Sequence, residues 1–379
     1  MRPWSVPSTS ARLYGVVGDG VTDDTDALQS ACDQCARTGT CLDLPPGRFR
    51  ITRTLRTRAR LVFRGSGWQS RIVADGIAGP AICTYGGDGD ATEPGQCLSD
   101  FVVSGTATCA VAFVHCPQMT AARISLDAFT GTDGFVFEYV WGCEFDSLRT
   151  NGATLTGACV KINRTVLAST WRTCYTSNRA EHNLLVDQRV TEFSTGSASG
   201  FGRLHFDSFV AQGADVAGVR LAAFAGPITL TNLYTENVAV PAIVGNQETT
   251  SGWLDFHGCD FAGDRADSSC ALMLHRVSGV NVIGGRFDDA PIIVGGVTGA
   301  VVLVNPVRVG NRDLWALIRR TADTPSSMPL TIIGGGHNEH SRLILKTTGY
   351  GWAFREMTVD ATGAWQATSR SVPLVDAVA

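Results

Sequence analysis

Three carboxylic acids in the second half of the chain, Glu236, Asp260 and Asp288, recur at intervals of about two dozen residues. Tyr234 and Arg286 each lie two positions from a member of this set. Retaining glycosidases hold two carboxyl groups about 5 Å apart, and inverting glycosidases hold them about 6.5–9.5 Å apart with a water between them. An arginine orients an anionic sugar, and an aromatic ring stacks on a sugar face. The pattern therefore predicts a glycan-binding patch in which the three acids are catalytic candidates.

A second group of polar residues alternates along the segments that precede these acids. It consists of Glu144, Asp146, His205, Asp207, Asp255 and His257. Alternating Asp and His side chains can perform acid–base chemistry or bind a divalent metal, and the same pattern is typical of a solvated face or a subunit contact. We expect Asp255 and His257 to contact substrate, together with Gln212, which lies one interval before Glu236. We assign no metal ion and no cofactor to the chain.

The spacing of these residues comes from a repeat. Five segments share one pattern: LHFDSFVAQG (204–213), ITLTNLYTEN (228–237), LDFHGCDFAG (254–263), VNVIGGRFDD (280–289) and VVLVNPVRVG (301–310). The fifth residue of each is small or turn-prone: Ser208, Asn232, Gly258, Gly284 and Asn305. Gly and Asn adopt a left-handed backbone at low cost. Two strands bent around one such residue, repeated every 21–26 residues, predict coils of a parallel β-helix from about residue 41 to 336.

The alternation of apolar residues before each turn predicts strands with one buried face. Stacked coils of such a fold lie about 4.8 Å apart. Glu236 and Asp260 are then expected one coil apart, and Glu236 and Asp288 two coils apart. The same register directs three cysteines inward, which favours buried thiols over disulfides: Cys143, Cys174 and Cys259.

The only strong helix signal lies near the start of the chain. Residues 22–25 (TDDT) supply the side-chain oxygens and early negative charge that favour a helix N-terminus. The apolar residues that follow share one helical face: Ala27, Leu28, Ala31, Cys32 and Cys35. We expect this helix to cover the open end of the stack, whose hydrogen-bonding groups are otherwise exposed.

Composition excludes several classes of protein. Of the 379 residues, 44% are hydrophobic and 17% charged, which argues against disorder. The formal net charge of −4 argues against a nucleic-acid partner. The start of the chain has no apolar signal sequence, so we expect no secretion by that route. The longest apolar run, Ile292 to Val304, is short and broken by glycines, and a pair of buried strands explains it better than membrane insertion.

The front of the chain resembles the pectate-lyase-like β-helix proteins, a group that includes bacteriophage tailspikes and polysaccharide depolymerases. The resemblance rests on LYGV (13–16), GDGVTDDT (18–25), LPPGRFRI (44–51) and LVFRGSG (61–67). It covers residues 13–75 by motif, and the repeat pattern extends it. The Asp-rich and Gly-His-Gly type signatures of pectin-degrading members have no convincing counterpart, so pectin chemistry is not supported.

The resemblance implies an all-β, right-handed, single-stranded parallel β-helix that forms a homotrimer on a phage tail. Its glycan would be a bacterial lipopolysaccharide or capsule, bound and cleaved by glycoside hydrolysis with the paired carboxylates. We divide the chain into an N-terminal arm (1–13), an opening segment with the capping helix (14–40), the β-helix (41–340) and a C-terminal β region (341–379). The arm would dock on a tail adaptor or nozzle protein, and the C-terminal region would trimerise or simply plug the helix. The alternatives are a non-enzymatic receptor-binding or structural virion protein, and a bacterial polysaccharide lyase.

Overall fold

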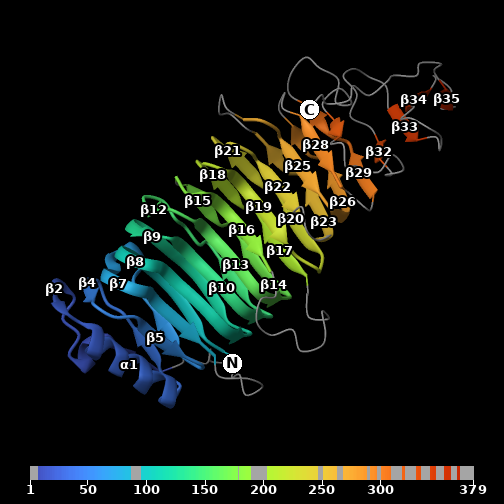
Figure 1. Cartoon of the computed structure of the whole chain (residues 1–379). Coiled ribbons are helices and arrows are strands. Elements are labelled where there is room, and N and C mark those ends of the chain that lie inside the picture. Colours follow the sequence, from blue (N-terminus) through green and yellow to red (C-terminus); the bar gives the residue numbers. More distant parts are fainter. Residues whose placement is uncertain are drawn as a thin grey trace.

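Each coil of the molecule consists of short parallel strands that stack on the equivalent strands of the next coil (Figure 1). The computed structural model describes residues 7–86, 95–177, 179–188, 203–245, 251–262, 268–287, 291–296 and 300–308, and the later strands 318–320, 330–333, 342–346, 354–359 and 365–367. Within these residues the chain is an all-β parallel β-helix with one α-helix, which confirms the predicted fold class.

Three faces run along the stack. The first face contains β11 (Glu144–Asp146), β14 (Ser169–Arg172), β17 (Leu204–Asp207), β20 (Ile228–Thr231), β23 (Ser251–His257), β26 (Val277–Ile283), β29 (Ala300–Val304) and β32 (Leu330–Ile333). The second contains β15 (Tyr175–Ser177), β18 (Val210–Gln212), β21 (Tyr234–Glu236), β24 (Asp260–Phe261), β27 (Arg286–Phe287) and β30 (Val307–Arg308). The third contains β10 (Asp133–Trp141), β13 (Ala158–Leu167), β16 (His182–Asp187), β19 (Ala217–Ala223), β22 (Ala242–Gly245), β25 (Leu272–His275), β28 (Ile292–Gly295) and β31 (Ile318–Arg320). The repeat pattern predicted the first two faces and missed the third.

The earlier coils use longer strands that continue around the corners. They are β7 (Ser70–Tyr85), β8 (Cys97–Pro117) and β9 (Thr120–Gly131), with the short β12 (Thr154–Leu155) paired to β9. The start of the chain adds β1 (Ser8–Ser10), η1 (Ala11–Tyr14), β2 (Asp19–Asp23), α1 (Thr25–Thr38), β3 (Cys41–Asp43), β4 (Gly47–Ile51), β5 (Leu55–Arg58), β6 (Val62–Arg64) and η2 (Gly67–Gln69). After β32 the pairing becomes antiparallel through β33 (Arg342–Lys346), β34 (Phe354–Val359) and β35 (Trp365–Ala367).

The predicted turn residues form one column between the first and second faces. Their φ angles are all positive: 56° at Ser208, 52° at Asn232, 61° at Gly258, 67° at Gly284 and 47° at Asn305. The backbone N–H of Asn232 donates to the carbonyl of His257 in the next coil (2.8 Å), and Gly258 N–H donates to Ile283 (2.8 Å) in the same way. The turns are therefore stacked, as the repeat predicted.

Because this column requires a left-handed backbone, a β-branched residue in it should destabilise the fold. Replacing Asn232 (φ 52°) by valine is expected to lower the free energy of unfolding by about 1–2 kcal/mol. Asn232→Gly keeps the accessible conformation and serves as the matched control. Urea denaturation followed by circular dichroism measures both variants. A valine variant as stable as the glycine variant would contradict the assignment of this corner.

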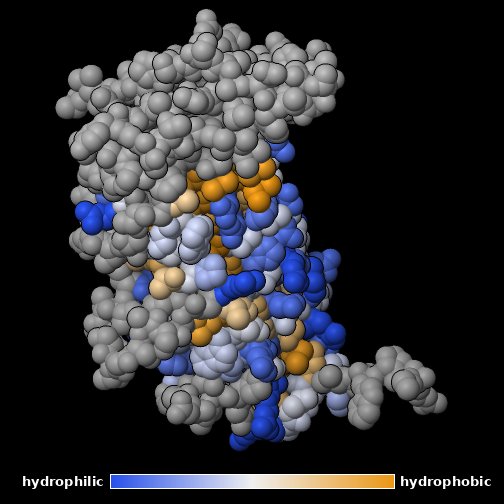
Figure 2. Space-filling view, turned by 90° about the vertical axis from the view of Figure 1, so that its right-hand side faces the viewer, coloured by the Kyte–Doolittle hydropathy of each residue, from blue (hydrophilic) through white to orange (hydrophobic). Residues whose placement is uncertain are grey.

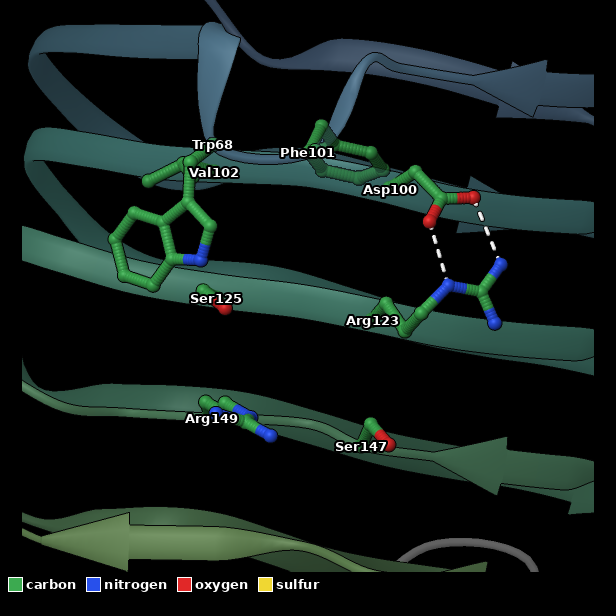
Figure 3. Close-up of a pocket in the computed structure, with 9 residues that line it drawn as sticks. Trp68, Asp100, Phe101, Val102, Arg123, Ser125, Ser147 and Arg149 are labelled. Carbon is green, nitrogen blue, oxygen red and sulfur yellow. Dashed lines mark hydrogen bonds and ion pairs between the residues drawn. The ribbon is translucent and has the colours of Figure 1, made fainter.

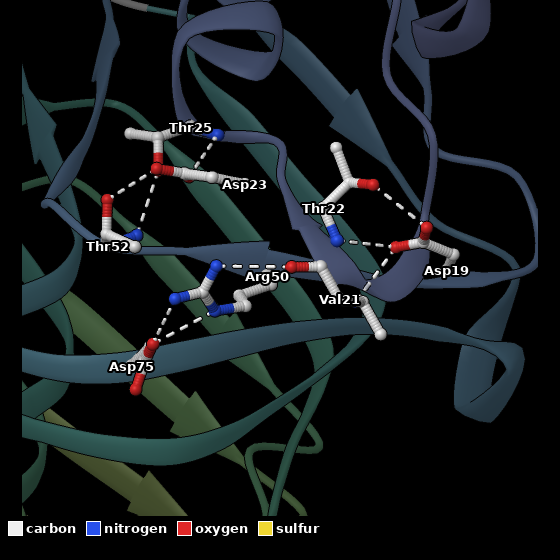
Figure 4. Close-up of polar contacts among 8 residues, drawn as sticks. All are labelled: Asp19, Val21, Thr22, Asp23, Thr25, Arg50, Thr52 and Asp75. Carbon is white, nitrogen blue, oxygen red and sulfur yellow. Dashed lines mark hydrogen bonds and ion pairs between the residues drawn. The ribbon is translucent and has the colours of Figure 1, made fainter.

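Helix α1 lies at the N-terminal end of the stack and buries the expected face against it (Figure 1). Its start differs in detail from the prediction. The Asp24 carboxylate does not cap the helix, because it accepts hydrogen bonds from the backbone N–H groups of Val17 (2.7 Å) and Gly18 (2.9 Å). The Asp23 carboxylate instead accepts from the N–H of Thr25 (3.0 Å), as Figure 4 shows. The hydrogen bonds from Thr25 hold the pKa of Asp23 below its usual range.

The interior is a continuous apolar core that runs the length of the described coils. Cys143, Cys174 and Cys259 are each 1% exposed, which confirms their inward placement. All twelve cysteines are free thiols, and burial raises the pKa of Cys174 to about 12. Ile292 to Val304 contributes β28 and β29, the pair of buried strands that was expected. Among the described residues, no helix has the length and apolar character needed to cross a membrane.

Candidate functional site

Two of the predicted acids, Glu236 and Asp260, lie on the second face, where backbone pairing fixes their relative positions. Tyr234 pairs with Asp260, and Asp260 pairs with Arg286, so these three residues form one vertical column. Glu236 lies two residues further along and pairs with Gln212. Asp288 lies outside the described residues.

Glu236 and Asp260 are consequently diagonal neighbours. Asp260 lies one coil after Glu236 and is also displaced from it by two residues along the strand. The sequence-based prediction placed them one coil apart and did not include the displacement along the strand. With strands about 4.8 Å apart and a rise of about 3.3 Å per residue, their Cα atoms lie about 8 Å apart. Two side chains that start about 8 Å apart on the same face leave room for a water between their carboxyl groups, as inverting glycosidases require.

Both carboxylates are held by neighbouring side chains. Nη1 of Arg286 donates to Oδ2 of Asp260 at 2.8 Å, and the Asp260 side chain is 18% exposed. Nε2 of Gln212 donates to Oε2 of Glu236 at 2.9 Å, and the hydroxyl of Tyr175 donates to Oε1 of Gln212 at 2.9 Å. The chain of contacts from Tyr175 to Glu236 orients that carboxylate along the outer surface. Tyr234 is 40% exposed, so its ring is accessible to a ligand.

Asp255 and His257 lie elsewhere, on β23 of the first face, before the left-handed corner. Oδ1 of Asp255 accepts a hydrogen bond from Nδ2 of Asn281 at 2.8 Å. Figure 2 shows the side that lies at the right of Figure 1, where the first-face strands are labelled; hydrophobic patches interrupt a largely hydrophilic surface there. Two first-face residues, Trp253 and Ile283, are 47% and 41% exposed. In the described part of the chain, no three His, Cys, Asp or Glu residues are grouped so as to hold a metal ion.

The sequence reading missed a pocket nearer the N-terminus. Its volume is about 290 Å³, and it is lined by Gly67, Trp68, Asp100, Phe101, Val102, Arg123, Ser125, Ser147 and Arg149. Figure 3 shows Trp68, Ser125 and Arg149 on one side of the pocket and Asp100 and Arg123 on the other. The indole of Trp68 comes from η2 and is 57% exposed.

The two arginines of the pocket differ in their electrostatic surroundings. Nε and Nη2 of Arg123 donate to the two carboxylate oxygens of Asp100 at 2.5 and 2.8 Å. These hydrogen bonds hold the pKa of Asp100 below its usual range, so the pair is fully ionised and neutral overall at pH 7. Arg149 is exposed and makes no ion pair with any carboxylate among the described residues. The pocket therefore presents one uncompensated guanidinium beside an aromatic ring.

Backbone pairing joins the pocket to the predicted acids in a single column. Its successive members are Val102, Ser125, Arg149, Tyr175, Val210, Tyr234, Asp260, Arg286 and Val307. We call this the second-face column. At about 4.8 Å per coil its nine positions span about 38 Å. Ser125 and Arg149 occupy the same position in their coils as Tyr234 does in its coil. Extending the sequence repeat toward the N-terminus in that register would have identified two residues of the pocket.

Comparison by sequence places the front of the chain among known proteins. Residues 8–83 match the family described as rhamnogalacturonase A/epimerase, pectate lyase-like. A stretch of 65 residues, 17% of the chain, is 40% identical to the non-secreted LysM effector LysM19 of Penicillium expansum. The match spans only 5% of the length of that protein, so it characterises this segment alone.

Comparison by structure extends the likeness to the coils. The tailspike gp42 of Acinetobacter phage vb_AbaP_AS12 superposes with a TM-score of 0.58 at 9% identity, over 99% of this chain and 84% of that one. The Dettilon tailspike protein gp208 gives 0.55 at 13% identity, over 97% and 79%. The A-module of mannuronan C-5 epimerase AlgE6 from Azotobacter vinelandii gives 0.54 at 16% identity, over 88% and 100%. The chain thus has the parallel β-helix fold that these tailspikes share, and its residues 8–83 resemble the pectate-lyase-like family.

Proposed function

We propose that this protein is a phage tailspike that holds a bacterial surface polysaccharide along the second-face column. The observation that carries the proposal is the column itself, which joins the pocket of Trp68 and Arg149 at one end to Asp260 toward the other. Glu236 lies beside it, two residues beyond Tyr234 on the same strand. A long glycan suits such a row because stacked coils repeat its contacts at a constant interval. The tailspikes among the structural relatives support the same reading.

Cleavage of the bound glycan is assigned to the two described carboxylates. Glu236 is the general acid, and Asp260, charged and paired with Arg286, is the base that activates water. A Cα separation of about 8 Å leaves room for that water between the two side chains, which favours an inverting reaction. Asp288, two intervals after Glu236 in the sequence repeat, is the third proposed catalytic acid. Tyr234, Gln212 and Arg286 would bind the sugar.

The assembly is proposed on the same basis. Three chains would form a homotrimer, and residues 1–13 would dock on a tail adaptor or nozzle protein of the virion. The antiparallel strands β33 to β35 depart from the repeat and are the proposed trimerising region. Asp255 and His257, on the first face, then lie at a different surface from the glycan and would contact it only from a neighbouring subunit.

Incubation with purified lipopolysaccharides and capsules from a panel of bacterial strains tests this function. We expect binding to at least one polysaccharide, detected by surface plasmon resonance, and release of oligosaccharides with a new reducing end and one added water. Products with a carbon–carbon double bond would show that the protein is a lyase and not a hydrolase. Binding without release would favour a non-enzymatic receptor-binding protein. Absence of binding across the panel would contradict the proposal.

A further inference from the structure

We propose that the pocket at Trp68 binds an acidic sugar residue, one that carries a carboxylate. This inference rests on the proposed function, because the sugar is taken to be a unit of the polysaccharide along the second-face column. The polysaccharide that the protein binds would therefore contain a sugar with a carboxylate.

The charge of the pocket is the first reason. Asp100 and Arg123 neutralise each other through two hydrogen bonds, so that pair offers no net charge to a ligand. Arg149 has no ionic partner among the described residues and lines the pocket. A guanidinium binds a carboxylate through two parallel hydrogen bonds, which are about twice as strong as hydrogen bonds between neutral groups. An anionic ligand therefore gains a contact that a neutral one lacks.

The shape and lining of the pocket are the second reason. The side chain of Trp68 is more than half exposed, and Ser125 lies between it and Arg149 in Figure 3. An indole face packs against the carbon-bound hydrogens of a sugar ring, and Ser125 offers a hydroxyl to its oxygens. The Ser147 hydroxyl donates to Oδ2 of Asp146 at 2.9 Å, so its oxygen can accept from a sugar hydroxyl. The volume of about 290 Å³ is just below the usual range of about 300–1,000 Å³ for ligand sites, which suits a single sugar unit. These features fit a sugar ring, and Arg149 adds the preference for one that carries a carboxylate.

Binding to polymers that differ only in charge tests the inference. The full chain is titrated against alginate, polygalacturonate and hyaluronan, against the carboxyl-reduced form of each, against neutral dextran and mannan, and against a phosphomannan. We expect at least one uronate polymer to bind, and its carboxyl-reduced form to bind about tenfold more weakly or worse, as loss of a charge-assisted hydrogen bond predicts. The phosphomannan distinguishes a sugar carboxylate from a sugar phosphate, since a guanidinium binds both.

Variants locate the binding. Arg149→Gln is expected to weaken uronate binding about tenfold or more, and Arg149→Lys to restore part of it. Trp68→Ala should weaken binding to a similar extent. The matched controls are Trp253→Ala and Arg203→Gln, which change exposed residues outside the pocket and should leave binding unchanged.

Each other result overturns the inference. If native and carboxyl-reduced polymers bind equally well, the pocket does not recognise the carboxylate. If Arg149→Gln and Trp68→Ala bind as the wild type does, the carboxylate is not bound in this pocket. Binding only to the neutral polymers or only to the phosphomannan rejects the acidic sugar and retains a polysaccharide-binding function. Failure to bind any of these polymers or any bacterial polysaccharide rejects the inference and the proposed function together.

Discussion

Glu236→Gln is expected to lower oligosaccharide release by about 10²–10⁴-fold, the contribution typical of a general acid. Glutamine has the shape of glutamate but cannot deliver a proton to the leaving oxygen. The contact with Nε2 of Gln212 survives through the new amide oxygen, so the outer end of β21 should keep its geometry. Polysaccharide binding should therefore stay within about twofold of wild type while release is lost.

Glu138→Gln provides the matched control. Oε1 of Glu138 accepts a hydrogen bond from Nδ2 of Asn163 at 3.1 Å, as Glu236 accepts one from Gln212, but Glu138 lies on β10 of the third face. This variant should release oligosaccharides at the wild-type rate. Activity is measured as reducing ends formed per unit time on a polysaccharide that the wild type cleaves. Full activity of Glu236→Gln would show that Glu236 is not the general acid. Asp260→Asn is expected to match the loss seen for Glu236→Gln.

Trp171→Ala is expected to lower the free energy of unfolding by about 3–5 kcal/mol, because Trp171 is the largest fully buried side chain among the described residues. Trp171 on β14 is fully buried between two aromatic rings of adjacent coils. Its ring lies 5.1 Å from that of Phe145 at 26° and 4.9 Å from that of Phe206 at 18°. Truncation removes both contacts and leaves a cavity in the middle of the stack.

Two further variants isolate the cause of that loss. Trp171→Phe keeps an aromatic ring in the stack and removes an indole N–H that has no hydrogen-bond partner among the described residues, so it should be much less destabilising than alanine. Trp253→Ala, at a position that is 47% exposed, should cost little. Urea midpoints followed by circular dichroism compare the three. An alanine variant at residue 171 that unfolds with wild-type stability would mean that the aromatic stack is not part of the core.

Much of the fold was predictable because its sequence signals are local. Asn232, Gly258 and Gly284 predict corners with a left-handed backbone, and the alternation of apolar residues around each corner identifies the buried face. The third face was not predicted as a face because segments such as Ala242–Gly245 are short apolar runs without alternation, although Ile292–Gly295 was expected to be a buried strand. They also follow connections of variable length, so no fixed offset from the corner marks them.

The site was predictable only in part, for a similar reason. Tyr234, Asp260 and Arg286 share a repeat register, and they do form a column. Glu236 is offset diagonally from Asp260 because it lies further along its strand after the corner residue, in addition to lying in the preceding coil. The pocket combines Trp68 with Arg149, which are 81 positions apart in the chain. Trp68 belongs to η2 and not to the repeat, so no period links it to Arg149.

A crystal structure of the full chain with a bound oligosaccharide tests the central claim most directly. We predict sugar density along the second-face column, with one unit against Trp68 and Arg149 and the chain extending toward Asp260 and Arg286. Density confined to the first or third face, with the second-face column empty, would contradict the account.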